Sequence, residues 1–191
     1  MYHQFKELAN IDITEQPMEV GPTTHYVMGG VRVDSESQMS CVPGLFAAGE
    51  CGGGLHGSNR LGGNSLSDLL VFGKRAGKYA ADFSSKNKIA EINEDQVKEV
   101  ARQALEPFER DADSSSESPY QVQFELQESM QNLVGIVRNE QDMLRGLEEI
   151  ERLRERAHGV GVYGNREYNP GWHAAIELLN LLTTSEAITR A

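Results

Sequence analysis

A glycine-rich stretch from Val42 to Leu70, VPGLFAAGECGGGLHGSNRLGGNSLSDLL, constrains the fold of this chain more than any other feature. Seven of its residues from Gly49 to Gly63 are glycine. The pattern predicts a short buried strand over Gly44–Ala48, a glycine loop, and a helix that begins near Asn64 and runs to about residue 83. Glycine lets a backbone approach a ligand closely, and the first N–H groups of a helix can bind an anion. We therefore expect the loop to bind an anionic or polarised group.

Two cationic side chains are candidates for binding such a group. Arg60 stands in the glycine loop, and a guanidinium presents paired donors that fit a carboxylate. The alternative for Arg60 is a pair with Asp68 or Glu50, or a place on the surface. His25 precedes a Gly-Gly break, and its ring can donate to a carboxylate oxygen. A single histidine is more often structural, so both interpretations stay open for His25.

Glu50 and the start of the helix are candidates for a cofactor. Glu50 follows the predicted strand, where open α/β sheets bind their ligands, and its carboxylate suits sugar-like hydroxyls better than a phosphate. Asn64, which we expect to cap the helix, supplies its first N–H groups together with Ser65 and Leu66. These donors would stabilise negative charge on a ring carbonyl, as in a reduced flavin. There is no GxxxxGK[ST] motif and no GxGxxG preceded by a strand, so we expect no phosphate-binding loop proper.

Composition excludes several classes of function. Acidic residues outnumber basic ones 29 to 18, for a net charge of −11, which disfavours nucleic acid as a partner. No apolar run is long enough to span a bilayer, and the first residues carry no signal-peptide pattern. Cys41 and Cys51 form no metal-binding pattern, and we expect two reduced, buried or half-buried thiols. The chain opens and closes without capping signals, so we expect a fragment.

The rest of the chain divides into a short β-rich part and a helical part. Residues 26–28 and 31–33 favour a hairpin or bulged strand that ends at Asp34. The polar segment 84–93 predicts a linker, which gives domains 1–84 and 85–191. Apolar spacing then predicts helices over about 97–108, 122–137, 143–153 and from 172 onward, and the break near 138–139 is either a turn or a kink. The predicted fold class is α+β, mostly α: a remnant of an α/β domain followed by an antiparallel helical bundle.

Four separated motifs resemble one family. The segments THYVMGGVRVD, VPGLFAAGE, HGSNRLGGNSLSDLLVFG and REYNPGW are similar, in order and spacing, to the flavoprotein subunit of succinate dehydrogenase and fumarate reductase. The resemblance implies the late part of the FAD-binding domain and the helical domain. It also implies an enzyme that oxidises succinate to fumarate, or catalyses the reverse, by hydride transfer to FAD.

The resemblance assigns the same residues that the chemistry selects. It implies that His25 and Arg60 hold a carboxyl group of the dicarboxylate substrate, that Glu50 binds the FAD ribityl chain, and that the backbone of Ser65 and Leu66 contacts the flavin ring. The resemblance further implies that the intact protein binds an iron–sulfur subunit and membrane anchor subunits, and that its electrons pass to quinone. It also implies that the protein lies on the inner, cytoplasmic face of the cell membrane, held there by these subunits. The family's dinucleotide fingerprint, flavin-attaching histidine and proton-delivering arginine have no counterpart here, so we expect this segment alone to be inactive and to lack FAD. The alternatives are an L-aspartate oxidase-like flavoenzyme and a non-catalytic helical interaction module.

Overall fold

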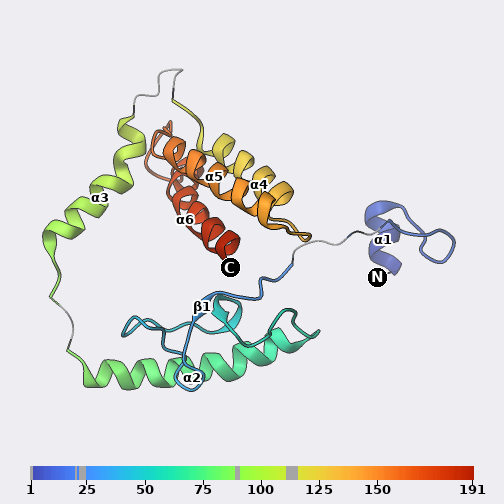
Figure 1. Ribbon diagram of the computed structural model, residues 1–191, viewed down its shortest axis with the longest axis horizontal. Helices are drawn as coiled ribbons and strands as arrows, with labels where there is room; N and C mark the ends of the chain where they lie inside the picture. Colours follow the sequence, from blue (N-terminus) through green and yellow to red (C-terminus); the bar gives the residue numbers. More distant parts are fainter. Residues whose placement is uncertain (1, 20, 22–24, 89–90, 111–115) are drawn as a thin grey trace. The chain divides into compact units, whose positions relative to one another are not determined.

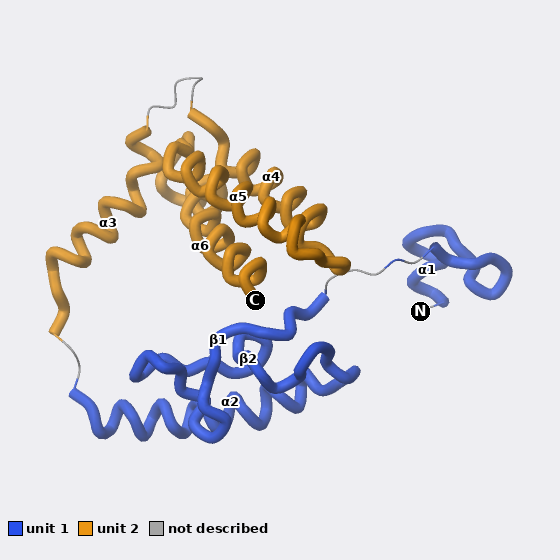
Figure 2. The backbone as a smooth tube through the Cα atoms, viewed as in Figure 1, with its two compact units in different colours: residues 1–90 blue, residues 91–191 orange. Residues whose placement is uncertain are grey.

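The computed structural model describes residues 2–19, 21, 25–88, 91–110 and 116–191 (Figure 1). Contacts divide the chain into two compact units, residues 1–90 and 91–191 (Figure 2). The elements, in chain order, are α1 (Tyr2–Ala9), β1 (Val31–Arg32), the short 3-10 helix η1 (Gly49–Cys51), β2 (Gly52–Gly53), α2 (Asn64–Lys86), α3 (Glu94–Glu109), α4 (Pro119–Leu133), α5 (Glu140–Ala157) and α6 (Pro170–Arg190). The predicted class, α+β and mostly helical, is confirmed.

The strands of the first unit are much shorter than predicted. β1 pairs with β2 in parallel, with Val31 opposite Gly52 and Arg32 opposite Gly53, so residues 26–34 do not fold back on themselves as a hairpin. The strand predicted over Gly44–Ala48 is wrong as well: only Phe46 forms a β-bridge there, with Met39. The reason is the turn at residues 35–37, where Asp34 accepts bonds from nearby N–H groups and sends the chain through a tight meander.

Helix α2 lies along this meander. Arg75 donates to the Ser35 carbonyl oxygen at 3.2 Å, and the Tyr79 hydroxyl donates to Glu36 at 3.3 Å. Phe83 packs edge-on against Phe46, with 6.2 Å between ring centroids. The helix begins at Asn64 as predicted and continues to Lys86, past the predicted start of the linker at residue 84.

The second unit is a bundle of three helices with a fourth at its end (Figure 1). The end of α4 lies beside the first half of α5, at Val134 and Gly146, whereas Arg156 at the end of α5 binds Glu117, just before α4 begins. These two helices are therefore antiparallel. The core consists of the buried apolar side chains Val122, Leu126, Ile150, Leu153, Ala157, Val160, Val162, Ala175, Leu178 and Leu182. Helix α3 joins it through Trp172, whose indole N–H donates to the Ala104 carbonyl oxygen at 2.6 Å.

The helical predictions hold best in this unit. The open question near residues 138–139 is settled in favour of a turn, because α4 ends at Leu133 and α5 begins at Glu140. Val137, predicted to lie in the second helix of the bundle, is in this turn and is 91% exposed. Part of the predicted break at 111–119 lies outside the described residues. No helix in the described part of the chain combines the length and apolarity that crossing a membrane requires.

Candidate functional site

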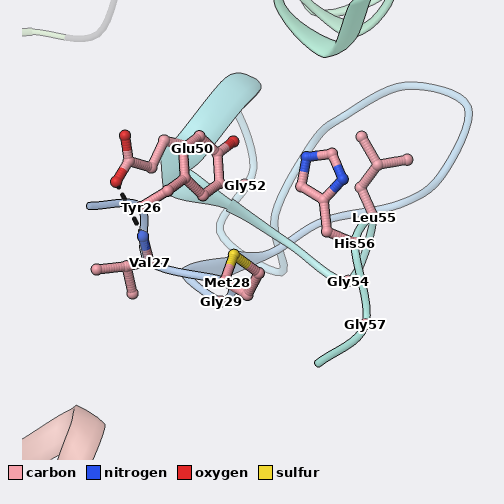
Figure 3. Close-up of a pocket in the computed structure, with 10 residues that line it drawn as sticks. All are labelled: Tyr26, Val27, Met28, Gly29, Glu50, Gly52, Gly54, Leu55, His56 and Gly57. Carbon is pink, nitrogen blue, oxygen red and sulfur yellow. Dashed lines mark hydrogen bonds between the residues drawn. The ribbon is translucent and has the colours of Figure 1, made fainter. Parts of the chain in front are cut away.

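The parallel pair β1–β2 brings the segment around Tyr26 against the glycine loop. The two backbones approach so closely that a Cβ atom at Gly30 would overlap the Cys51 carbonyl group, and one at Gly53 would lie 3.1 Å from the Gly30 carbonyl oxygen. Glu50 adds a second tie, because its Oε1 accepts a hydrogen bond from the Val27 N–H at 3.1 Å (Figure 3). Glycine at these positions is therefore required for the strand pairing.

Two cavities lie beside this junction. The smaller one, of about 40 Å³, is lined by Glu50, His56 and the 26–29 segment, and Figure 3 shows these residues around it. The larger one, of about 280 Å³, is lined on one side by the glycines at 49 and 52–54 and on the other by Asp68 and Phe72 of α2. Both cavities include glycines in their lining, and at these positions a ligand can approach the backbone closely.

Arg60 lies over an aromatic ring rather than beside a carboxylate. Its guanidinium carbon is 4.6 Å from the centroid of the Tyr26 ring, and one terminal nitrogen donates to the Leu61 carbonyl oxygen at 3.2 Å. Its Nε is buried without a hydrogen-bond partner among the described residues. The alternative that Arg60 pairs with Asp68 or Glu50 is not realised, because none of the ion pairs in the described ranges includes Arg60. This side chain keeps hydrogen-bonding capacity that the chain does not use.

The Tyr26 ring beneath Arg60 meets two further side chains, His56 and Asp68, and sequence reasoning missed this arrangement. Tyr26 meets His56 edge-on at 5.7 Å between centroids, and the Tyr26 hydroxyl lies 3.5 Å from the Oδ2 atom of Asp68. His56 Nε2 lies 3.4 Å from the same oxygen, within ion-pair distance but without hydrogen-bond alignment. Burial, followed by the nearby Asp68 carboxylate, raises the pKa of Tyr26. The available signal was Asp68 itself, a charged residue among the leucines that open a helix.

His25 and Glu50, the other two predicted side chains of the site, are both exposed. His25 precedes Tyr26 directly and is exposed, and its side chain takes part in no hydrogen bond among the described residues. Glu50 is exposed and uses one carboxylate oxygen for the Val27 amide; the other is without a partner in the described part of the chain. His25 and Glu50 therefore retain polar atoms that a ligand could use.

The start of α2 differs from the predicted cap. The N-cap residue is Gly63 in a left-handed conformation with φ of 84°, and Asn64 is the first helical residue, so Asn64 does not cap the helix. The Asn64 N–H donates to the Leu61 carbonyl oxygen and the Leu66 N–H to that of Gly63, at 3.1 and 3.2 Å. Of the three predicted donors, the Ser65 N–H is the one outside these turn bonds.

The loop does contain a GxGxxG spacing, although we expected no such motif after a strand. Gly52, Gly54 and Gly57 follow the GxGxxG pattern, which begins within β2. The helix starts only at Asn64, however, so the motif leads into a turn and not into the helix N-terminus that binds a phosphate. Within the described ranges, no group of three or more His, Cys, Asp or Glu residues is arranged to hold a metal ion. Both cysteines are free and exposed, which corrects the expectation of buried thiols.

Two parts of the chain match known protein families. Residues 1–66 match the family described as FAD binding domain, and residues 123–191 match the family described as fumarate reductase flavoprotein C-term. One chain of the fumarate reductase (CoM/CoB) of Methanothermobacter marburgensis is 37% identical over all of this chain and 34% of its own length. The succinate dehydrogenase flavoprotein subunit of Coxiella burnetii is 35% identical over 95% of this chain and 32% of its own length.

Solved structures give the same result. A chain of the Mycobacterium smegmatis Sdh1 complex in the apo form matches all of this chain with a TM-score of 0.91 and 52% identity, over 32% of its own length. The fold and these matches thus define part of an FAD-binding flavoprotein. Within that class, the chain belongs to the succinate dehydrogenase/fumarate reductase flavoprotein family, and it spans about a third of the length of the relatives it matches.

Proposed function

We propose that this chain forms part of the substrate and flavin site of an enzyme that interconverts succinate and fumarate. The observation that carries the proposal is the state of Arg60, a guanidinium held over the Tyr26 ring in a glycine loop with no carboxylate partner in the described ranges. A half-buried cation of this kind is stabilised when an anion binds. The names of the relatives, fumarate reductase and succinate dehydrogenase, supply the dicarboxylate as that anion.

Arg60 and His25 are the residues that we assign to the substrate. The guanidinium of Arg60 forms paired hydrogen bonds to one carboxylate group, and a planar fork fixes the orientation of the bound diacid as well as its charge. His25 donates a further hydrogen bond to a carboxylate oxygen from the segment beside the loop. Together the two residues hold the C–C bond of the diacid in a fixed position, which is their contribution to catalysis.

Glu50 and the start of α2 are the residues that we assign to FAD. Glu50 accepts a hydrogen bond from the Val27 N–H with one carboxylate oxygen, and its other oxygen accepts a hydrogen bond from a ribityl hydroxyl. The Ser65 N–H donates a hydrogen bond to the flavin ring. Asn64 and Leu66 line the same helix start, although their N–H groups are engaged in turns. FAD, when bound, supplies the acceptor and donor of the hydride. The residues of this chain orient the ring and keep water from it.

We propose the partners on the same basis. The matching solved structures include an Sdh1 complex with UQ1 and a quinol–fumarate reductase with menaquinol. By analogy, electrons pass from the flavin to an iron–sulfur subunit, membrane anchor subunits bind the quinone, and the flavoprotein lies on the inner face of the cell membrane through these subunits.

The proposal is tested by placing residues 1–191 in a working enzyme. The host is the matching chain of the Mycobacterium smegmatis Sdh1 complex, with the aligned third replaced by this chain. We expect Arg60→Lys to lower kcat/KM for succinate on the order of 100-fold, because a point charge does not replace two charge-assisted hydrogen bonds. The matched control is Lys74→Arg, the reverse exchange at an exposed position of α2.

The two variants separate the proposal from a general loss of positive charge. Lys74→Arg should leave kcat/KM within about twofold of the unsubstituted chimera, because a surface exchange that keeps the charge changes little. Equal losses in the two variants, or full activity of Arg60→Lys, would contradict the assignment of Arg60 to the substrate.

A further inference from the structure

The glycine loop alone does not explain how Arg60 is held. A long side chain between exposed loop residues has many rotamers, and fixing such a side chain for bidentate binding costs conformational entropy. The backbone supplies one contact, from the guanidinium to the Leu61 carbonyl oxygen. That carbonyl belongs to the next residue of the same loop, so it moves with Arg60 and cannot anchor it.

The Tyr26 ring supplies a support from outside the loop. It faces the guanidinium at 4.6 Å, which is within the range of a cation–π contact. Stacking on a ring leaves the in-plane N–H groups of a guanidinium free, so the contact orients the cation without using the donors that a carboxylate needs.

Tyr26 is in turn fixed on two sides. His56 packs its ring edge-on against the Tyr26 ring, and the Tyr26 hydroxyl points to the Asp68 carboxylate. Asp68 is 4% exposed and is the one buried residue of α2 within the described part of the chain. A charged side chain is rarely this buried unless it has partners, and the two groups that approach its Oδ2 are the Tyr26 hydroxyl and His56 Nε2.

We propose that Tyr26 is a positioning residue for Arg60. Asp68, which belongs to helix α2, fixes the orientation of the Tyr26 ring through its contacts with the Tyr26 hydroxyl and with His56. This inference rests on the proposed function, in which Arg60 binds a carboxylate group of the substrate. It adds a chain of contacts from α2 to the guanidinium, and it predicts that the ring of Tyr26 matters more than its hydroxyl.

The kinetic test uses the assembled chimeric complex. Tyr26→Leu should lower kcat/KM for succinate about 10-fold, most of it as a higher KM, because Arg60 remains present but loses its orientation. Tyr26→Phe keeps the ring and should lower kcat/KM by no more than about threefold. The matched control is Tyr79→Leu, at a tyrosine of α2 whose hydroxyl binds Glu36, and it should leave both constants unchanged.

Rescue by guanidinium separates positioning from a purely structural role. In Arg60→Ala, guanidinium ion added well below unfolding concentrations should restore part of the activity, because the Tyr26 ring still offers the place where the lost group stacked. In Arg60→Ala combined with Tyr26→Leu, the same addition should restore none. Equal rescue with and without the Tyr26 ring would overturn the inference.

A direct measurement covers the case in which a variant complex fails to assemble. In the 191-residue chain, ring current from Tyr26 should shift the NMR signal of the Arg60 side-chain Nε–H, and the shift should vanish in Tyr26→Leu but persist in Tyr79→Leu. An Arg60 signal that Tyr26→Leu leaves in place would overturn the inference as well. If Arg60→Ala itself leaves kcat/KM unchanged, the proposed function fails; if Arg60→Ala loses activity and Tyr26→Leu does not, only the role of Tyr26 fails.

Discussion

Gly30 shows how one residue makes the site possible. It has φ of 123°, which favours glycine, and its Cα faces the Cys51 carbonyl group with no room for a side chain. This close approach lets β1 pair with β2 and brings Tyr26 beside the loop that carries Arg60. The Gly29-Gly30 break therefore serves the contact between two backbones.

We predict that Gly30→Ala loosens this junction by about 1–3 kcal/mol, because the new Cβ meets a carbonyl group and the backbone angle disfavours any other residue. Hydrogen exchange of the amides in β1 and β2 should become about 5- to 160-fold faster in the 191-residue chain. Gly73→Ala is the control: a Cβ there meets nothing within 4 Å, and in a helix it should stabilise by about 0.5–1 kcal/mol. Unchanged protection in Gly30→Ala would contradict the prediction.

Helix α5 is the element that ties the second unit together. Near its end, Arg156 binds Glu117, which precedes α4, and Glu125 of α4, and Arg154 binds Glu186 of α6 at 2.7 Å. Hydrogen bonds from Arg156 lower the pKa of Glu125 to about 2 from its ordinary value of 4.5. Since the folded-state pKa is below the unfolded one, the pair stabilises the bundle above about pH 4.5 and loses this effect as the pH falls toward 2.

We predict that Glu125→Gln lowers the free energy of unfolding of the bundle by about 1–2 kcal/mol at pH 7, discounted for the partial exposure of the pair. At pH 3 the difference in unfolding free energy between Glu125→Gln and the unsubstituted chain should be less than half of the difference at pH 7. Fluorescence of Trp172 during urea unfolding checks this, because it is the single tryptophan and packs against Phe108 in this unit.

Glu128→Gln provides the control for this experiment. Glu128 lies on the same helix, is exposed, and belongs to none of the ion pairs in the described ranges. It should change the unfolding free energy by less than about 0.5 kcal/mol at both pH values. A Glu125→Gln effect that is the same at pH 7 and pH 3 would show that the loss is not electrostatic.

Helix α2 marks the limit of what the sequence reveals. Its start at Asn64 follows from the glycines before it, but its leucine spacing does not identify which face of the helix is buried. In the structure Leu66 and Leu70 are 67% and 76% exposed, and the buried residue is Asp68. Periodicity shows which residues share one face of a helix. It does not show which of the faces packs against the neighbouring segment that follows Asp34. The contacts of Asp68 with Tyr26 and His56 join positions far apart in the sequence, so no local pattern contains them.

The two units differ in how completely the sequence determines them. Within the described residues, Ala47 is the one buried apolar side chain of the first unit, and all the others belong to the helical bundle. Regular apolar spacing therefore predicts the bundle well, whereas the first unit depends on glycine geometry and single polar contacts. For the same reason the residue types of the candidate site are predictable from the loop, but the stacking of Arg60 on Tyr26 is not.

This imbalance leads to a prediction for the whole molecule: the 191-residue chain should not retain FAD. Its two cavities beside the glycine loop measure about 40 and 280 Å³, at or below the range of about 300–1,000 Å³ that is typical for sites of much smaller ligands. The chain incubated with excess FAD and passed through gel filtration should elute without a flavin absorbance band, whereas the chimeric complex, carried through the same steps as the control, should retain the cofactor. Stoichiometric flavin with the 191-residue chain would mean that the glycine loop, Glu50 and the start of α2 are by themselves a complete binding site.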